Sequence, residues 1–281
     1  MTKYTLSYTQ KQVRKQCERK WYLQYEKGIE DTKPKSEALV FGEFVHLILA
    51  QYMREYYQDF SSEQLDGWNL SSIRVEAWHS LSSKEALSKI PSHVVEGEAH
   101  RLVLKALQVL QKDYQEIYLF DNKPAIEVEL TIDNFYTGII DLVYIDKRGK
   151  VILLDWKTTS SLYTNHQVKQ SEQLKGYAWL LAQHSVIVDR VAYGVLHKKN
   201  KTAKIMKVRN DQNYRGFVKG IKKVKLDNEH YLRLHRGKSI LTSFPKNQDS
   251  CFAYRSECQF YDQCWGEDKR EVEVIQREVV S

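Results

Sequence analysis

A predicted β-hairpin that carries two acids and a lysine constrains the fold of this chain more than any other feature. The apolar run before Asp141 predicts one strand, and residues 151–154 predict a second strand after a short linker that contains a glycine. The length of the linker is typical of a hairpin turn. On the second strand Asp155 and Lys157 are two positions apart and share one face, whereas Trp156 points to the other face.

Acids and a lysine on one face of a strand have two interpretations. If they are buried, they destabilise the fold unless they are paired or bound to a metal ion. If they are exposed, they form an ordinary surface ion pair, which contributes little. The working interpretation is a divalent cation held beside a phosphate, and the triplet of Asp155, Trp156 and Lys157 does not by itself decide between the two.

Composition narrows the class of protein. The chain has 281 residues, and its apolar share of 42% is enough for a sizeable core. No apolar run approaches the roughly 20 residues of a membrane helix, and the first residues have no signal-peptide core. We therefore expect a cytoplasmic, soluble protein that does not interact with membranes. The net charge of +7 suits a polyanionic partner but is weak support for one.

Periodicity predicts a mixed α/β domain in which helices sandwich a central sheet. Helices are expected at residues 7–25, 39–57, over most of 61–119, at 166–183 and at 213–235, and strands within 125–155, 188–197 and 203–209. We expect a single domain over 1–281, made of N-terminal helices (1–60), a helical insertion (61–120), a core (121–210) and a C-terminal segment (211–281).

The four cysteines are the second strong signal. One lies in the first predicted helix and three crowd into the end of the chain, at Cys17, Cys251, Cys258 and Cys264. In a reducing compartment four thiolates suit a tetrahedral zinc ion or a 4Fe–4S cluster better than disulfides. The gaps of six and five residues fit a cluster better than the paired knuckles of zinc sites. Zinc and free buried thiols remain alternatives.

Six features in order along the chain resemble a known family: Cys17, a G-x-x-x-H pair, a G-x-x-D pair, a D-x-K pair, a Q-x-x-x-Y pair and the three terminal cysteines. The paired motifs are Gly42 and His46, Gly138 and Asp141, Asp155 and Lys157, and Gln173 and Tyr177. Together they resemble the PD-(D/E)XK nucleases of the RecB type. They are most similar to the iron–sulfur branch, which includes CRISPR adaptation nucleases, helicase-associated nuclease domains and stand-alone viral exonucleases. The resemblance runs from Cys17 to Cys264.

The resemblance implies a restriction-endonuclease-like core and a role for each matching residue. His46 matches a metal-ligating histidine, and Asp141 an acid that bridges the metal to water and phosphate. Asp155 matches the second acid, and Lys157 the lysine that orients or activates the attacking water. The main-chain carbonyl of Trp156 is a further expected ligand for Mg²⁺ or Mn²⁺, and imidazole favours Mn²⁺.

Two further roles follow from the same resemblance. Gln173 and Tyr177 match the motif that borders the catalytic site and touches DNA, and the four cysteines match those that hold a 4Fe–4S cluster. The chain departs from the family pattern in the spacing of its last three cysteines. The acid that precedes the G-x-x-D motif is either Glu127 or Glu129, and both stay open.

The expected function is that of a Mg²⁺- or Mn²⁺-dependent deoxyribonuclease, an exonuclease that hydrolyses single-stranded or frayed DNA ends. A second hypothesis is a catalytically silent DNA- or partner-binding module of the same fold. A third is a redox sensor whose cluster alters binding. Besides DNA, the expected partners are a second copy of the chain or a protein of recombination or CRISPR adaptation.

Overall fold

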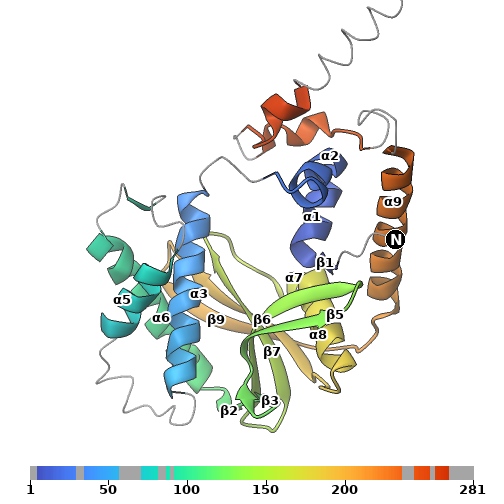
Figure 1. The fold of residues 1–281 in the computed structure, drawn as a ribbon. Helices are drawn as coiled ribbons and strands as arrows, with labels where there is room; N and C mark the ends of the chain where they lie inside the picture. Colours follow the sequence, from blue (N-terminus) through green and yellow to red (C-terminus); the bar gives the residue numbers. More distant parts are fainter. Residues whose placement is uncertain are drawn as a thin grey trace, which may run out of the picture. The chain divides into compact units, whose positions relative to one another are not determined.

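The computed structural model describes seven stretches of the chain, namely residues 5–29, 35–56, 71–81, 87–88, 92–235, 244–253 and 257–265. They form two compact units, drawn in Figure 1 with the sequence running from blue to red. The first unit combines residues 1–34, 133–136 and 215–281, and the second combines 35–132 and 137–214.

The second unit is built on a mixed sheet in the order β6–β7–β8–β9, with β2 and β5 also paired to β6. The strands are β2 (Tyr114–Ile117), β5 (Ile126–Ile132), β6 (Tyr136–Asp146), β7 (Val151–Thr159), β8 (Arg190–His197) and β9 (Thr202–Arg209). The predicted hairpin is confirmed as β6 and β7, which pair antiparallel with Val143 opposite Leu153. A separate small ribbon joins β3 (Leu119–Phe120) to β4 (Lys123–Pro124).

A helical crossover links β7 to β8, which lie parallel. One helix was predicted over 166–183, and this prediction is wrong in one respect, because the crossover contains α7 (Asn165–Gln170) and α8 (Glu172–Gln183). Ser171 separates them in an extended conformation, and its hydroxyl accepts a hydrogen bond from the Leu174 N–H at 3.1 Å. The serine therefore acts as the N-cap of α8, a role that competes with its staying inside one continuous helix.

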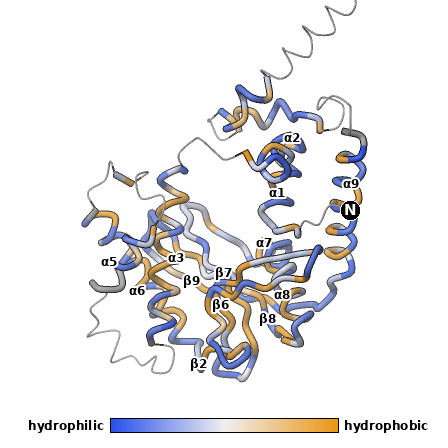
Figure 2. Tube along the Cα trace, viewed as in Figure 1, coloured by the Kyte–Doolittle hydropathy of each residue, from blue (hydrophilic) through white to orange (hydrophobic). Residues whose placement is uncertain are grey.

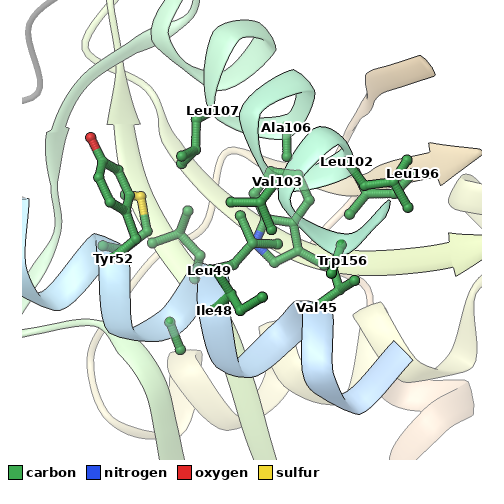
Figure 3. Close-up of a cluster of buried hydrophobic side chains, with 14 of the residues drawn as sticks. Val45, Ile48, Leu49, Tyr52, Leu102, Val103, Ala106, Leu107, Trp156 and Leu196 are labelled. Atoms are coloured by element: carbon green, nitrogen blue, oxygen red, sulfur yellow. The ribbon is translucent and has the colours of Figure 1, made fainter. Parts of the chain in front are cut away.

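Three helices form the main core with one face of the sheet. They are α3 (Glu37–Tyr56), α5 (Ser71–Ser80) and α6 (Ser92–Gln111). Figure 3 shows side chains of α3 and α6, among them Val45, Leu49 and Val103, packed around the Trp156 ring from β7. Val45, Leu49 and Tyr52 recur at helical spacing along α3 and are all buried.

The alternation along β7 sends its polar residues away from that core. Ile152, Leu154 and Trp156 belong to the cluster formed with α3 and α6. Asp155 and Lys157 therefore project to the opposite face, which α7 and α8 cover. Much of β8 and of α8 is apolar, as the colouring in Figure 2 shows, and residues 191–197 of β8 and 176–181 of α8 are buried. A buried carboxylate at Asp155 thus lies in a largely apolar interior.

The helix predicted to continue to residue 119 ends earlier. α6 ends at Gln111, and residues 114–117 form β2 at the edge of the sheet. Tyr114 lies opposite Asp146, and the Tyr144 hydroxyl donates to Asp113 at 2.6 Å, so the pairing with β6 outweighs the local helical pattern. Residues 57–70, 82–86 and 89–91 of the predicted helical insertion lie outside the described residues.

The first unit gathers the helices of both chain ends. They are α1 (Tyr8–Gln16), α2 (Glu18–Trp21), a π-helical turn (Tyr22–Glu26) and α9 (Arg215–His235), beside a two-residue strand β1 (Leu6–Ser7). Ser7 is the N-cap of α1, and its hydroxyl accepts a hydrogen bond from the Gln10 N–H. The predicted continuous helix is interrupted at Cys17, which is extended at φ −160°. None of the described helices is long and apolar enough to cross a membrane.

Candidate active site

Three side chains from three elements of the second unit converge on one point. They are His46 of α3, Glu127 of β5 and Asp141 of β6, and each offers one ligand atom within 4.8 Å of the other two. The His46 Nδ1 atom lies 3.5 Å from the Asp141 Oδ2 atom. Within the described stretches of the chain, this is the only group of three or more acidic, histidine or cysteine side chains arranged closely enough to hold a metal ion.

Backbone geometry distinguishes Glu127 from Glu129, the choice that the sequence left open. Strand alternation gives the two glutamates the same face, but Glu127 has a positive φ of 49° and joins the group, whereas Glu129 is exposed. A non-glycine residue at positive φ inside a strand is strained and re-aims its side chain. The strain is a signal of function that no sequence pattern contained.

The hairpin fixes the orientation of Asp141. This residue lies inside β6 and not at the end of a strand, as was predicted. Its Oδ2 atom accepts a hydrogen bond from the main-chain N–H of Trp156 on the neighbouring strand at 2.7 Å. The register of β6 and β7 therefore fixes the carboxylate beside His46.

A chain of polar contacts connects β7 to α8. The Lys157 Nζ atom lies 2.6 Å from Asp155 Oδ2 and donates to Gln173 Oε1 at 2.9 Å. The Gln173 amide in turn donates to the Tyr177 hydroxyl at 3.1 Å. The Lys157 ammonium also lies 5.4 Å from the centre of the Tyr193 ring. Four predicted site residues are thus brought together, and Gln173 and Tyr177 share one helical face as expected.

Two glycines allow this arrangement to pack. A Cβ atom added at Gly138 would lie 2.5 Å from Tyr177 Cε1, and one added at Gly194 would overlap the ring of Trp156. Gly194 lies opposite Trp156 in the β7–β8 register. The glycine of the G-x-x-D motif is therefore needed by the tyrosine of the Q-x-x-x-Y motif, a link between two motifs that only the tertiary structure reveals.

Burial and mutual repulsion make the three acids reluctant to ionise. Desolvation, with the nearby Asp141 charge, raises the pKa of Glu127 to about 7. Desolvation raises the pKa of Asp141 to about 6, against the hydrogen bond from Trp156 and the charge of Lys157. Desolvation and the Asp141 carboxylate raise the pKa of Asp155 to about 6. Three carboxylates in one place favour a cation among them.

The pKa values of His46 and Lys157 shift in opposite directions. Burial lowers the pKa of His46 despite the nearby Asp155 carboxylate, so the imidazole is neutral at neutral pH and can act as a ligand. Burial also lowers the pKa of Lys157. The ion pair with Asp155 has the larger effect and raises this pKa above its ordinary value. Lys157 therefore remains a cation beside the three acids.

The donor set suits a hard divalent ion. Two carboxylates and a neutral imidazole are ligands for Mn²⁺, Mg²⁺ or a similar ion, and the imidazole favours the more nitrogen-tolerant metals. Asp155 forms an ion pair with Lys157, and the main-chain N–H of Trp156 donates to Asp141. Their predicted roles as direct metal ligands stay predictions.

Comparison with protein families identifies the superfamily of this chain. The family model described as PD-(D/E)XK nuclease superfamily matches residues 5–264. The chain belongs to the PD-(D/E)XK nuclease superfamily. No curated protein sequence matches the chain. It is similar to the crystal structure of SSO0001 with 14% identity over 78% of this chain and 85% of that chain, at a TM-score of 0.28.

The first unit of this nuclease brings the four cysteines into one neighbourhood. Cys17, Cys251 and Cys264 are buried, and Cys258 is partly buried. Burial raises the pKa of Cys251, and the other three thiols raise it further. The Cys17 sulfur accepts main-chain N–H groups from Lys20 at 3.5 Å and Asn247 at 3.4 Å. The extended conformation at Cys17 thus exposes its sulfur to donors from both ends of the nuclease chain.

A buried arginine lies beside the cysteines and was not anticipated. Arg19 is 1% exposed, donates from Nε to the Phe244 carbonyl at 2.9 Å, and approaches Cys264 Sγ at 3.7 Å. Burial raises the pKa of Cys264, while the Arg19 guanidinium opposes this. A buried guanidinium must be paired or hydrogen-bonded, and the Phe244 carbonyl and the Cys264 sulfur are two of the partners of Arg19.

Proposed function

We propose that this protein is a metal-dependent deoxyribonuclease that acts as an exonuclease on single-stranded or frayed DNA ends. The observation that carries the proposal is the convergence of His46, Glu127 and Asp141 beside the Asp155–Lys157 ion pair. Membership of the nuclease superfamily supports phosphodiester hydrolysis. The motif set resembles the iron–sulfur branch, which works mostly on ends, and this resemblance supports exonuclease action.

In this proposal His46, Glu127 and Asp141 hold the cation, and Asp155 either joins them or anchors the lysine. A divalent cation bound there supplies Lewis-acid charge for hydrolysis of the phosphodiester. Holding the ligands on α3, β5 and β6 keeps them preorganised, which limits the reorganisation that the reaction requires.

Lys157 places a positive charge next to the water that attacks the phosphorus. Gln173 accepts one of its N–H bonds and limits the directions in which the ammonium can point. Tyr177 orients Gln173 in turn. In this assignment Lys157 acts on the reacting atoms, whereas Gln173 and Tyr177 are positioning residues that also border the DNA.

A 4Fe–4S cluster is the second part of the proposal, with Cys17, Cys251, Cys258 and Cys264 as its ligands. A tetrahedral zinc ion with bonds of about 2.3 Å needs sulfurs roughly 3.8 Å apart. In the part of the chain that the structure describes, no three of the cysteine sulfurs lie within 4.8 Å of one another. The wider spacing, the burial and the N–H groups aimed at sulfur fit a cluster better than zinc.

The nuclease proposal is tested with end-labelled linear DNA and with circular single- and double-stranded DNA, in Mn²⁺ or Mg²⁺. The inactive variant is Asp141→Asn, which keeps an oxygen for the Trp156 N–H but lowers the charge at the metal. Its control is Asp189→Asn, the same change at a partly exposed acid that pairs with Lys150 at the surface. Wild type and Asp189→Asn should digest linear DNA only, and Asp141→Asn should digest none.

Digestion of circles would replace the exonuclease assignment with an endonuclease. Absence of cleavage under all conditions, with DNA still bound, would favour the silent binding module. The cluster is tested separately by iron and sulfide analysis and visible absorption of anaerobically purified wild type, Cys258→Ala and Asp141→Asn. We expect Cys258→Ala to lose both iron and colour and Asp141→Asn to keep them. Zinc without iron in the wild type would refute the cluster.

A further inference from the structure

A cavity of about 700 Å³ lies along α3 in the second unit, beside the candidate metal site. His46 and Glu127 of the metal group line it, together with Lys157. Its volume falls within the range of ligand-binding clefts. The cavity is therefore continuous with the place where a phosphodiester would react.

Gly42 lines this cavity, and no close contact requires a glycine at this position. It lies in the middle of α3, where a glycine lowers helix stability relative to alanine. A Cβ atom added there would meet only Thr158 Cβ, at an ordinary distance of 3.9 Å. Gly138 and Gly194, by contrast, are required by close neighbours. The absence of a side chain at Gly42 thus preserves open space one helical turn from His46.

The walls of the cavity match the two halves of a nucleotide. Leu39, Leu47 and Leu81 provide apolar surface, and Leu39 is 53% exposed despite its size. Such a surface can pack against a base and a sugar. Most of the remaining lining is polar or charged, so the cavity is amphipathic, as a nucleotide is.

Arg54 provides a cation at this cavity. It is four positions from Ala50 and eight from His46 on the same helical face, roughly 12 Å beyond the histidine along the axis. Arg54 is exposed, and its charge acts on the metal group, where it opposes the rise in the pKa of Glu127. Lys35 also lines the cavity, but its Nζ atom is paired with Glu43 Oε1 at 2.7 Å. A guanidinium in this position matches a backbone phosphate.

We propose that this cavity binds the stretch of single-stranded DNA next to the cleaved bond, with Gly42 leaving room for a nucleoside and Arg54 holding a neighbouring phosphate. The inference rests on the proposed nuclease function and assigns it a substrate subsite. The base is held by packing, without a hydrogen-bonding code, so binding is tolerant of sequence.

The test compares two helical glycines. Gly42→Leu fills the cavity, whereas Gly97→Leu makes the same change in α6, where an added Cβ meets nothing within 4 Å and no cavity wall is altered. Binding of a fluorescent single-stranded oligonucleotide is measured by anisotropy in Ca²⁺, and Mn²⁺ binding by calorimetry. We expect Gly42→Leu to bind DNA about ten- to a hundredfold more weakly, with Mn²⁺ affinity and melting temperature equal to those of Gly97→Leu.

The second arm tests the phosphate contact. Arg54→Gln is compared with Arg101→Gln, an exposed arginine of α6. We expect Arg54→Gln to weaken binding about tenfold and to reduce the slope of log K against log salt by about 0.7, the value for one phosphate contact on a single strand. Arg101→Gln should change neither quantity.

The outcomes separate this inference from the proposed function. DNA binding by Gly42→Leu equal to that of Gly97→Leu would overturn the subsite even if the wild type cleaves DNA. Loss of Mn²⁺ binding in Gly42→Leu would also overturn it, because Gly42 would then protect the metal site. If the wild type cleaves no DNA but Gly42→Leu and Arg54→Gln still bind DNA more weakly than their controls, the subsite is supported and the nuclease proposal is refuted.

Discussion

Lys157 and Asp155 form an ion pair of 2.6 Å on the face of β7 that points away from the main core. The Asp155 side chain is 3% exposed, so nearly all of its compensation comes from protein groups. The pair brings a permanent cation to within reach of the group formed by His46, Glu127 and Asp141. It therefore links the stability of the sheet to the electrostatics of the candidate active site.

Removal of Lys157 should destabilise the metal-free protein because it leaves a buried carboxylate without a partner. We expect Lys157→Ala to lower the free energy of unfolding by roughly 3–5 kcal/mol at pH 8. The double variant Asp155→Asn with Lys157→Ala should recover most of this loss, since the uncompensated charge is gone. Urea denaturation in EDTA measures both. Equal losses in the single and double variants would mean that the pair does not compensate Asp155.

The raised pKa values predict that the metal-free protein loses stability as pH increases. Asp141, with an ordinary pKa of 3.8, titrates near 6 in the folded state, and Glu127 shifts from 4.5 to about 7. The folded protein therefore binds more protons than the unfolded chain between pH 4 and 7, and each deprotonation costs stability. For one such carboxyl the difference is roughly 3 kcal/mol.

The measurement is urea denaturation in EDTA between pH 4.5 and 7.5. The wild type should become less stable across this range relative to Asp141→Asn, in which one of the shifted carboxyls is missing. Mn²⁺ affinity should rise over the same interval, because the metal displaces the protons. Parallel stability curves for the two proteins would contradict the shift at Asp141.

Gly138→Ala should disturb the second half of the site without touching an ionisable group. The new methyl group would lie 2.5 Å from the Tyr177 ring and 3.3 Å from Leu180 Cδ1, so the ring must shift, which strains its hydrogen bond with Gln173. We expect a loss of about 1–3 kcal/mol in stability, typical of overpacking, and a lower kcat on DNA. Gly97→Ala is the control and should be slightly stabilising. Unchanged unfolding and turnover in Gly138→Ala would exclude this contact.

Arg19→Met should weaken the first unit. The substitution keeps an unbranched side chain but leaves the Phe244 carbonyl without its 2.9 Å hydrogen bond, at an expected cost of about 1–3 kcal/mol. Arg19→Lys, which keeps the charge without the guanidinium geometry, should fall between Arg19→Met and the wild type. Denaturant unfolding of anaerobically purified protein, with iron content as a second readout, checks the order. If Arg19→Met leaves the free energy of unfolding unchanged, solvent replaces the lost donor.

Local patterns were sufficient for the hairpin, the helical positions of Gln173 and Tyr177 and the extent of α3. Each of these depends on a period of 2.0 or 3.6 residues, which is written into consecutive positions. The superfamily could also be predicted, because its motifs occur in order along the chain. Boundaries were less accurate where a tertiary contact competed with propensity, as at Ser171 and at residues 114–117.

Other features depend on residues that are distant in the sequence and meet only in the fold. The sequence offered Glu127 and Glu129 equally, and a positive φ in β5 brings only Glu127 to His46. Arg19 is an ordinary helical arginine until Phe244, 225 positions later, provides its acceptor. The open space at Gly42 exists because nothing on the neighbouring strand fills it. Spacing along the chain encodes periodicity, whereas burial, strain and empty volume arise from long-range packing.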